Sequence, residues 1–291
     1  MCRLFGMSGG REPVSATFWL LEASDSLAAQ SRREPDGTGL GRFDSHDRPV
    51  VDKQPLAAYE DQDFARQARE VKSRTFVAHV RYASNGGLTV QNTHPFEQSG
   101  RLFAHNGVIG DVPALERELG EAMSMVAGDT DSERFFALMT REIARCGEVG
   151  EGIATACRWV AEHLPVLSLN FVLITPEELW ALRYPDTHEL HVLERVPGGP
   201  SGARHLEHAS ARGSIRVRSG DLRQRAAVIV ASECMDEDSG WRAVTPGELL
   251  HVGPDLELTS QQLFHGPPAQ LLTLADLDPK AAASQRASER T

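Results

Sequence analysis

The stretch Met1-Cys2-Arg3-Leu4-Phe5-Gly6 places a cysteine directly behind the initiator methionine. Because a small second residue permits removal of the methionine, we expect Cys2 to become the amino terminus. Its thiol and its α-amino group would then share one residue, with pKa values of about 8.5 and about 7.7 to 8.0. The amine can accept the thiol proton without a histidine. A cysteine on its own is more often a small buried hydrophobe, so this interpretation requires an oxyanion hole and a substrate clamp elsewhere in the chain.

The composition is that of a globular protein. Of the 291 residues, 41% are hydrophobic and 24% are charged, which is enough to build a core. The net charge of −11 and the lack of a basic stripe argue against nucleic acid as a partner. The longest apolar run, residues 166–174, is too short to cross a membrane. We therefore expect neither nucleic acid nor membrane as a partner.

The cysteines and the amino-terminal segment indicate a reducing compartment. No CxxC pair and no zinc-type spacing occurs among Cys2, Cys146, Cys157 and Cys234. No secretion signal is visible, and no phosphate-binding or dinucleotide-binding fingerprint occurs. We expect a cytoplasmic protein without a metal or cofactor.

Apolar periodicity predicts strands early and late in the chain, with a helical pair between them. The expected strands are residues 3–8, 75–82, 102–105, 166–174, 179–184, 189–196, 226–231 and 248–252. The expected helices are residues 13–21, 57–71, 131–145 and 152–164. This order favours an α+β domain of two sheets packed face to face with helices outside. We expect one domain over residues 2–275, a long loop over 197–213 and a flexible tail over 276–291.

Three further clusters carry side chains suited to chemistry. They are His79-Val80-Arg81-Tyr82-Ala83-Ser84-Asn85-Gly86, Asn92-Thr93-His94-Pro95-Phe96 followed by His105-Asn106-Gly107, and Gly128-Asp129-Thr130-Asp131-Ser132-Glu133. Each has an ordinary interpretation when taken alone. Arg81 could be a structural ion-pair partner, Asn106-Gly107 is a common turn dipeptide, and Thr130 followed by acidic residues is a helix cap.

Taken together, the order and spacing of these clusters resemble the glutaminase domain of class II glutamine amidotransferases, which are N-terminal-nucleophile hydrolases. That family has an initial cysteine, then R-x-x-D-(S/G)-x-G, H-x-R-(W/Y)-(A/S)-(T/S), N-x-H-P, H-N-G and T-D-(S/T)-E. Matching segments here are 33–39, 79–84, 92–95, 105–107 and 130–133. The resemblance implies a four-layer αββα sandwich. Residues 231–233 and 240–241 are similar to the stand-alone branch that includes the γ-glutamyl hydrolase of ergothioneine biosynthesis.

The resemblance also implies roles for individual residues. Cys2 would be the nucleophile, and the Asn106 side-chain amide and Gly107 N–H would form the oxyanion hole. Arg81 would bind the substrate α-carboxylate and Asp131 the α-ammonium. Further pocket residues would be Ser84, Asn85 and His94, with Arg33 as structural support.

Three functions are compatible with the sequence. The leading hypothesis is hydrolysis of a γ-glutamyl amide, either glutamine or a γ-glutamyl conjugate, through a γ-glutamyl thioester. The first alternative is a glutaminase subunit that delivers ammonia to a separate synthase partner. The second is a non-enzymatic ligand-binding scaffold, although a scaffold has no need of a nucleophile.

Overall fold

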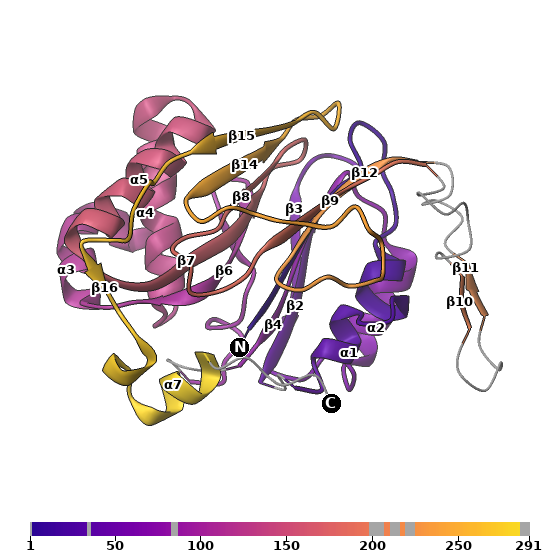
Figure 1. The fold of residues 1–291 in the computed structure, drawn as a ribbon, viewed down its shortest axis with the longest axis horizontal. Helices are drawn as coiled ribbons and strands as arrows, with labels where there is room; N and C mark the ends of the chain where they lie inside the picture. Colours follow the sequence, from indigo (N-terminus) through magenta and orange to yellow (C-terminus); the bar gives the residue numbers. More distant parts are fainter. Residues whose placement is uncertain are drawn as a thin grey trace.

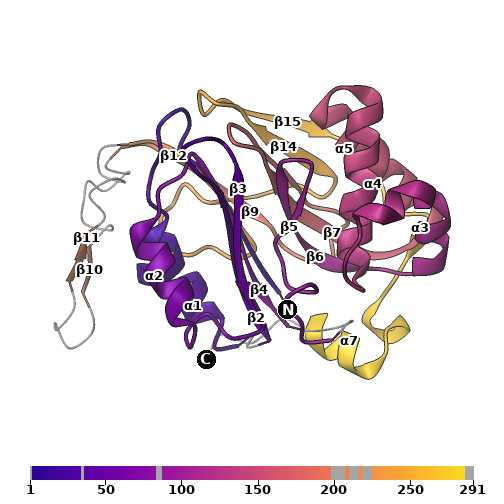
Figure 2. The same ribbon diagram turned by 180° about the vertical axis from the view of Figure 1, so that it is seen from behind.

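The computed structural model describes residues 2–33, 36–82, 87–197, 207–209, 216–218 and 225–285. Two β-sheets lie face to face in the middle of the molecule, with helices on the outer face of each (Figures 1 and 2). This arrangement confirms the predicted αββα sandwich.

The first sheet carries the amino terminus on its central strand, β1. Its order is β13 (Arg242–Ala243), β9 (His191–Arg195), β12 (Ala227–Ala231), β1 (Arg3–Ser8), β4 (Thr75–Arg81), β2 (Gly37–Phe43) and β3 (Pro49–Gln54). Successive side chains of a strand point to opposite faces. Leu4 accordingly packs in the core between the sheets, whereas Phe5 and Met7 pack under the helices. Because both faces of β1 are buried, its sequence is an almost continuous apolar run.

The second sheet brings the H-N-G motif opposite the first. Its order is β15 (Leu258–Gln262), β14 (Glu248–Val252), β8 (Leu179–Leu182), β7 (Pro165–Ile174), β6 (Arg101–Ile109) and β5 (Phe96–Gln98), and β16 (Gln270–Leu271) pairs in parallel with β7. A separate pair is formed by β10 (Glu207–Ala209) and β11 (Arg216–Arg218). The expected strand 102–105 is longer than predicted. Asn106 and Gly107 continue it, because they pair with Asn170 and Leu169 of β7 instead of forming a turn.

Helices cover each sheet and close its outer core. On the first sheet lie η1 (Phe18–Glu22), α1 (Leu27–Gln30) and α2 (Gln62–Glu70); on the second lie α3 (Val112–Leu119), η2 (Gly120–Met125), α4 (Asp131–Cys146) and α5 (Val149–His163). The predicted helical pair is therefore confirmed as α4 and α5. Two other helices are shorter than predicted. The segment 13–21 contains only η1, and α2 starts at Gln62 because the Asp61 carboxylate caps it by accepting hydrogen bonds from the N–H groups of Asp63 and Phe64.

The carboxyl-terminal segment differs from the expected tail over 276–291. After η4 (Leu274–Asp276), residues Pro279–Gln285 form helix α7. Ala281, Ala282 and Ser284 of this helix are buried, and the Gln285 side chain lies 2.8 Å from the ring Nε2 of His188. Small side chains can bury completely in a short helix, which composition alone does not reveal. Residues 286–291, and most of the predicted loop 197–213, lie outside the described residues.

Two kinds of feature do not occur in the part of the chain that the structure describes. None of the helices there combines the length and apolarity that a membrane span requires. In the same part of the chain, no group of three or more His, Cys, Asp or Glu side chains is arranged to hold a metal ion.

Candidate active site

Cys2 stands at the edge of the inter-sheet core, just before β1. The register of β1 and β4 pairs Arg3 with Val80, which brings Cys2 beside the end of β4. The Cys2 Sγ atom accepts a hydrogen bond from the Tyr82 N–H at 3.3 Å and lies 3.5 Å from the Tyr82 carbonyl oxygen. Cys2 is 8% exposed. Its sulfur therefore faces the polar backbone groups of Tyr82.

Asn106 reaches residue 2 from the opposite sheet. Its Nδ2 donates to the Cys2 carbonyl oxygen at 3.1 Å, and the side chain is 1% exposed. A carboxamide nitrogen carries two N–H groups, so this contact leaves one for another acceptor. Among the described residues, the Asn106 Oδ1 atom has no hydrogen-bond partner. The backbone thus fixes the amide of Asn106 beside Cys2.

Gly107 is required by close backbone packing. A Cβ atom there would lie 1.9 Å from the Ser168 carbonyl oxygen and 2.7 Å from His105 Nε2. Real side chains never approach so closely, so only glycine fits between β6 and β7 at this point. Gly107 itself remains partly exposed.

Arg81 and Asp131, the predicted clamp, lie within electrostatic range of one another and of Cys2. Arg81 is 4% exposed and donates from Nη1 to the Gly87 carbonyl oxygen at 3.1 Å. Burial lowers the pKa of Arg81, and the negative charges of Cys2, Asp36 and Asp131 oppose that effect. The guanidinium thus sits in a negative surrounding that offsets part of its desolvation.

The Asp131 carboxylate is oriented by backbone donors. Its Oδ2 accepts from the Ile109 N–H at 2.8 Å, and its Oδ1 accepts from the Ser132 N–H at 2.9 Å. Asp131 is the first residue of α4, and the Thr130 side chain caps that helix by accepting from the Glu133 N–H. A carboxylate in the first turn also complements the helix dipole. The T-D-S-E segment therefore caps helix α4 and also fixes the orientation of the Asp131 carboxylate.

The loop that holds Arg81 is tied to the segment that leads into Asp131. Asn92 Nδ2 donates to the Gly87 carbonyl oxygen at 3.3 Å and to Asp129 Oδ2 at 3.4 Å. Asn92 Oδ1 accepts from the Asp129 N–H at 2.8 Å. Asn92 is 1% exposed. This side chain therefore cross-links the two halves of the predicted clamp, a role that its motif does not disclose.

The histidines of the motifs are packed in the interior. His105 lies 2.9 Å from Ser132 Oγ through Nδ1 and 3.1 Å from the Ser168 carbonyl oxygen through Nε2. Because a carbonyl only accepts, Nε2 carries the proton and Nδ1 accepts from the serine hydroxyl. His94 lies between His79 and Phe96, whose rings are tilted against its own, with ring centroids 4.3 and 4.5 Å away. Burial lowers the pKa of His94 well below its ordinary value.

Arg33 lies in a network of charged side chains that the sequence did not indicate. Its Nη2 lies 3.2 Å from Glu233 Oε2 and 3.3 Å from Asp25 Oδ1. Glu233 also forms an ion pair with Arg3, the neighbour of Cys2, at 2.7 Å. A charged residue at the start of a buried strand signals a buried partner, and Arg3 was that signal. Ser84 and Asn85 lie outside the described residues.

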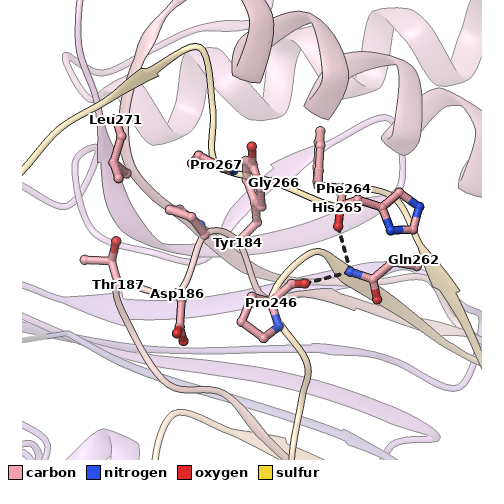
Figure 3. A pocket seen from close by; sticks show the side chains of 11 residues that line it. Tyr184, Asp186, Thr187, Pro246, Gln262, Phe264, His265, Gly266, Pro267 and Leu271 are labelled. Carbon is pink, nitrogen blue, oxygen red and sulfur yellow. Dashed lines mark hydrogen bonds between the residues drawn. The ribbon is translucent and has the colours of Figure 1, made fainter.

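A separate cavity of about 430 Å³ lies between the core and the chain that follows β15 (Figure 3). Its walls include the aromatic pair Tyr184 and Phe264, whose rings stack with centroids 4.0 Å apart, together with Pro246 and Leu271. The predicted site residues do not line it. The candidate active site is thus defined by converging side chains and not by this cavity.

Known proteins resemble this chain in sequence. A sequence model of the family described as "Glutamine amidotransferases class-II" matches residues 1–264. The chain belongs to this family. The Saccharomyces cerevisiae protein named "Probable glutamine amidotransferase DUG3" is 31% identical over 302 residues, covering 87% of this chain and 82% of the relative.

Solved structures of the family share the fold. The glutamine phosphoribosylpyrophosphate amidotransferase from B. subtilis superposes with a TM-score of 0.62 at 20% identity over 93% of this chain. This chain covers 51% of that enzyme, about half of its length. A "predicted glutamine amidotransferase" from Pseudomonas aeruginosa superposes with a TM-score of 0.57 at 20% identity, covering 89% of this chain and 100% of the other.

Proposed function

We propose that this class II glutamine amidotransferase hydrolyses a γ-glutamyl amide with Cys2 as the nucleophile. The observation that carries the proposal is the 3.1 Å contact between the Asn106 amide and the Cys2 carbonyl oxygen. It places an amide donor beside the residue whose thiol would attack. Arg81 and Asp131, which would bind the two charges of an amino-acid end, lie in the same electrostatic surrounding.

The reaction would proceed through a covalent intermediate. After removal of Met1, the Cys2 amine accepts the thiol proton, and the sulfur forms a bond to the γ-carbonyl carbon. The oxyanion receives the second N–H of Asn106 and the N–H of Gly107, donors worth roughly 3 to 4 kcal/mol in comparable enzymes. Collapse breaks the C–N bond, the leaving nitrogen takes the proton from the Cys2 amine, and a γ-glutamyl thioester remains. Water then hydrolyses the thioester to glutamate and regenerates the thiol.

Specificity for a free amino-acid end would come from opposite charges held apart by the fold. Arg81 offers a planar pair of donors that suits a carboxylate. Asp131, fixed by the N–H groups of Ile109 and Ser132, offers an acceptor to an ammonium group. A γ-glutamyl compound has both groups at one end, whereas the group beyond its γ-carbonyl would be left to other parts of the site.

The test is a hydrolysis screen with untagged protein that begins at Cys2. Glutamate release from glutamine and from a panel of γ-glutamyl amides is followed by mass spectrometry. We expect turnover that Cys2→Ala abolishes without a change in melting temperature, and that Cys146→Ser, a control at a partly exposed thiol, leaves intact. Full turnover by the Cys2→Ala protein would refute the proposal.

One observation favours a second candidate, a glutaminase subunit that delivers ammonia to a synthase partner. This chain covers only half of the B. subtilis amidotransferase, so in that protein the shared fold is joined to a further part. Under this candidate, free glutamine would be hydrolysed very slowly until a partner is added. Robust turnover of a γ-glutamyl conjugate by the chain alone would decide against it.

A further inference from the structure

Arg3 is a buried cation in direct contact with the nucleophile's backbone. It is 1% exposed, although it begins a strand that is otherwise apolar. Its Nη1 donates to the Cys2 carbonyl oxygen at 3.4 Å, and its Nη2 lies 2.7 Å from Glu233 Oε1. A buried charge is tolerated only when it is paired and hydrogen-bonded. The Arg3 guanidinium thus links Glu233 to residue 2.

Glu233 uses its second oxygen for another cation. Glu233 Oε2 lies 3.2 Å from Arg33 Nη2, and Arg33 also contacts Asp25. The backbone position of Glu233 is set by Ser232, whose N–H donates to the Leu4 carbonyl and whose Oγ accepts from the Leu4 N–H at 2.9 Å. One carboxylate therefore bridges two guanidinium groups beside the start of β1.

We propose that Glu233 is a positioning residue for Cys2, which holds Arg3 against the Cys2 carbonyl and balances the positive charge of Arg3 and Arg33 beside the thiol. The proposal rests on Cys2 being the nucleophile of the proposed function. It assigns a role to the Ser232-Glu233 segment, which follows β12.

Charged groups from several elements meet in this network. Arg3 comes from β1, Arg33 and Asp25 from the connection between η1 and β2, and Glu233 from the segment after β12. Arg81 of β4 lies within electrostatic range of Cys2, Asp36 and Asp131. His188 lies within range of Arg3, and burial lowers its pKa to about 4, so it is neutral at pH 7. Glu233 is the carboxylate that contacts both guanidinium groups on the Arg3 side.

Charge-changing variants have opposite expected effects. Glu233→Gln keeps an oxygen to accept from Arg3 but removes the negative charge, so the titration of the Cys2 thiol and amine should move to lower pH by about one unit. Arg33→Gln removes a positive charge and should move the same titration to higher pH. Glu233→Asp keeps the charge but is one methylene shorter, so it should lose contact with one of the two guanidinium groups and reduce kcat more than it shifts the titration.

The experiment measures the pH dependence of Cys2 alkylation by iodoacetamide, with peptide mass spectrometry to separate Cys2 from the other cysteines. Glu248→Gln is the control, since Glu248 of the second sheet is also a carboxylate paired with an arginine, Arg242, at 3.0 Å. Melting curves accompany each variant. We expect the pH midpoint of Cys2 alkylation to shift in opposite directions in Glu233→Gln and Arg33→Gln, and not to shift in the control. For Glu233→Gln we also expect kcat to fall about tenfold while KM changes less than twofold.

Several outcomes would overturn the proposal. They are shifts of the same sign in Glu233→Gln and Arg33→Gln, an unchanged midpoint in Glu233→Gln, or an equal shift in Glu248→Gln. If Glu233→Gln fails to fold, Arg33→Gln alone tests the proposal. An unchanged midpoint of Cys2 alkylation in Arg33→Gln would then count against it. Alkylation needs no substrate, so a chain that hydrolyses no γ-glutamyl amide yet shows the opposite shifts would refute the proposed function and leave the role of Glu233 standing.

Discussion

At the scale of the residue, Gly107 shows how the site depends on a missing side chain. The Ser168 carbonyl oxygen occupies the place where a Cβ atom would stand, at 1.9 Å. The obstacle is backbone, which cannot swing aside as a flexible side chain could. We predict that Gly107→Ala is destabilised by about 2 to 3 kcal/mol and loses most of its turnover, because β6 must shift and carry Asn106 with it.

The matched control for this prediction is Gly266→Ala, since an added Cβ at Gly266 would meet no atom within 4 Å. Chemical denaturation and glutamate release are measured for both variants. A Gly107→Ala protein as stable and as active as the Gly266→Ala protein would contradict the close-packing argument.

At the scale of the element, Asn92 joins two connections that each carry half of the predicted clamp. It shares the Gly87 carbonyl oxygen with Arg81, at 3.3 Å, and makes two contacts with Asp129, at 2.8 and 3.4 Å. Because the side chain is buried, its removal deprives the Asp129 N–H of the acceptor that Asn92 Oδ1 provides. We predict that Asn92→Ala raises KM for a γ-glutamyl amide about tenfold, with kcat changed much less.

The neighbouring exposed amide gives a control, since Gln91→Ala alters no buried contact of the clamp. Steady-state kinetics of both variants, with melting curves, check the prediction. If Asn92→Ala lowered kcat and left KM unchanged, its cross-link would not be serving substrate binding.

The elements themselves were largely predictable, because most of their signals are local. Strand β1 has both faces buried, so its apolar run identifies it directly. Helices α4 and α5 follow from their apolar spacing and from the Thr130 cap. The strand end expected after His105 was wrong, because pairing with β7 extends the strand through Asn106 and Gly107 despite their turn propensity.

At the scale of the whole molecule, the side-chain contacts between distant parts of the chain could not be predicted from the sequence. Arg3 meets Glu233 only because β1 and β12 are neighbours in the first sheet, and Asn106 meets Cys2 only because the second sheet faces the first. Such contacts join distant parts of the chain, and no local pattern encodes them. The family resemblance supplied the motif residues, whereas the contacts of Asn92 and Glu233 required the folded chain.

The interior histidines make the stability of the whole molecule depend on pH. Burial lowers the pKa of His79 to about 3 and that of His188 to about 4, and it lowers that of His94 well below its ordinary value. Below a pH of about 6.5 the histidines of the unfolded chain bind protons and those of the folded chain do not. Protonation therefore stabilises the unfolded state relative to the folded state. Stability is therefore complete above that pH and is lost as the pH falls, by about 1.4 kcal/mol per pH unit for His79. We predict that the free energy of unfolding falls steeply between pH 7 and pH 5.

A variant of His94, whose ring lies against that of His79, tests which groups make the stability depend on pH. Both ring nitrogens of His94 lack a hydrogen-bond partner among the described residues, so His94→Gln removes a titrating group without breaking such a bond. Its unfolding free energy, measured by denaturant titration at several pH values, should depend less on pH than that of the parent chain. The exposed His265 is the control, because His265→Asn should retain the parent dependence. If His94→Gln and His265→Asn gave the same slope as the parent, the acid sensitivity would come from the carboxylates and not from the buried imidazoles.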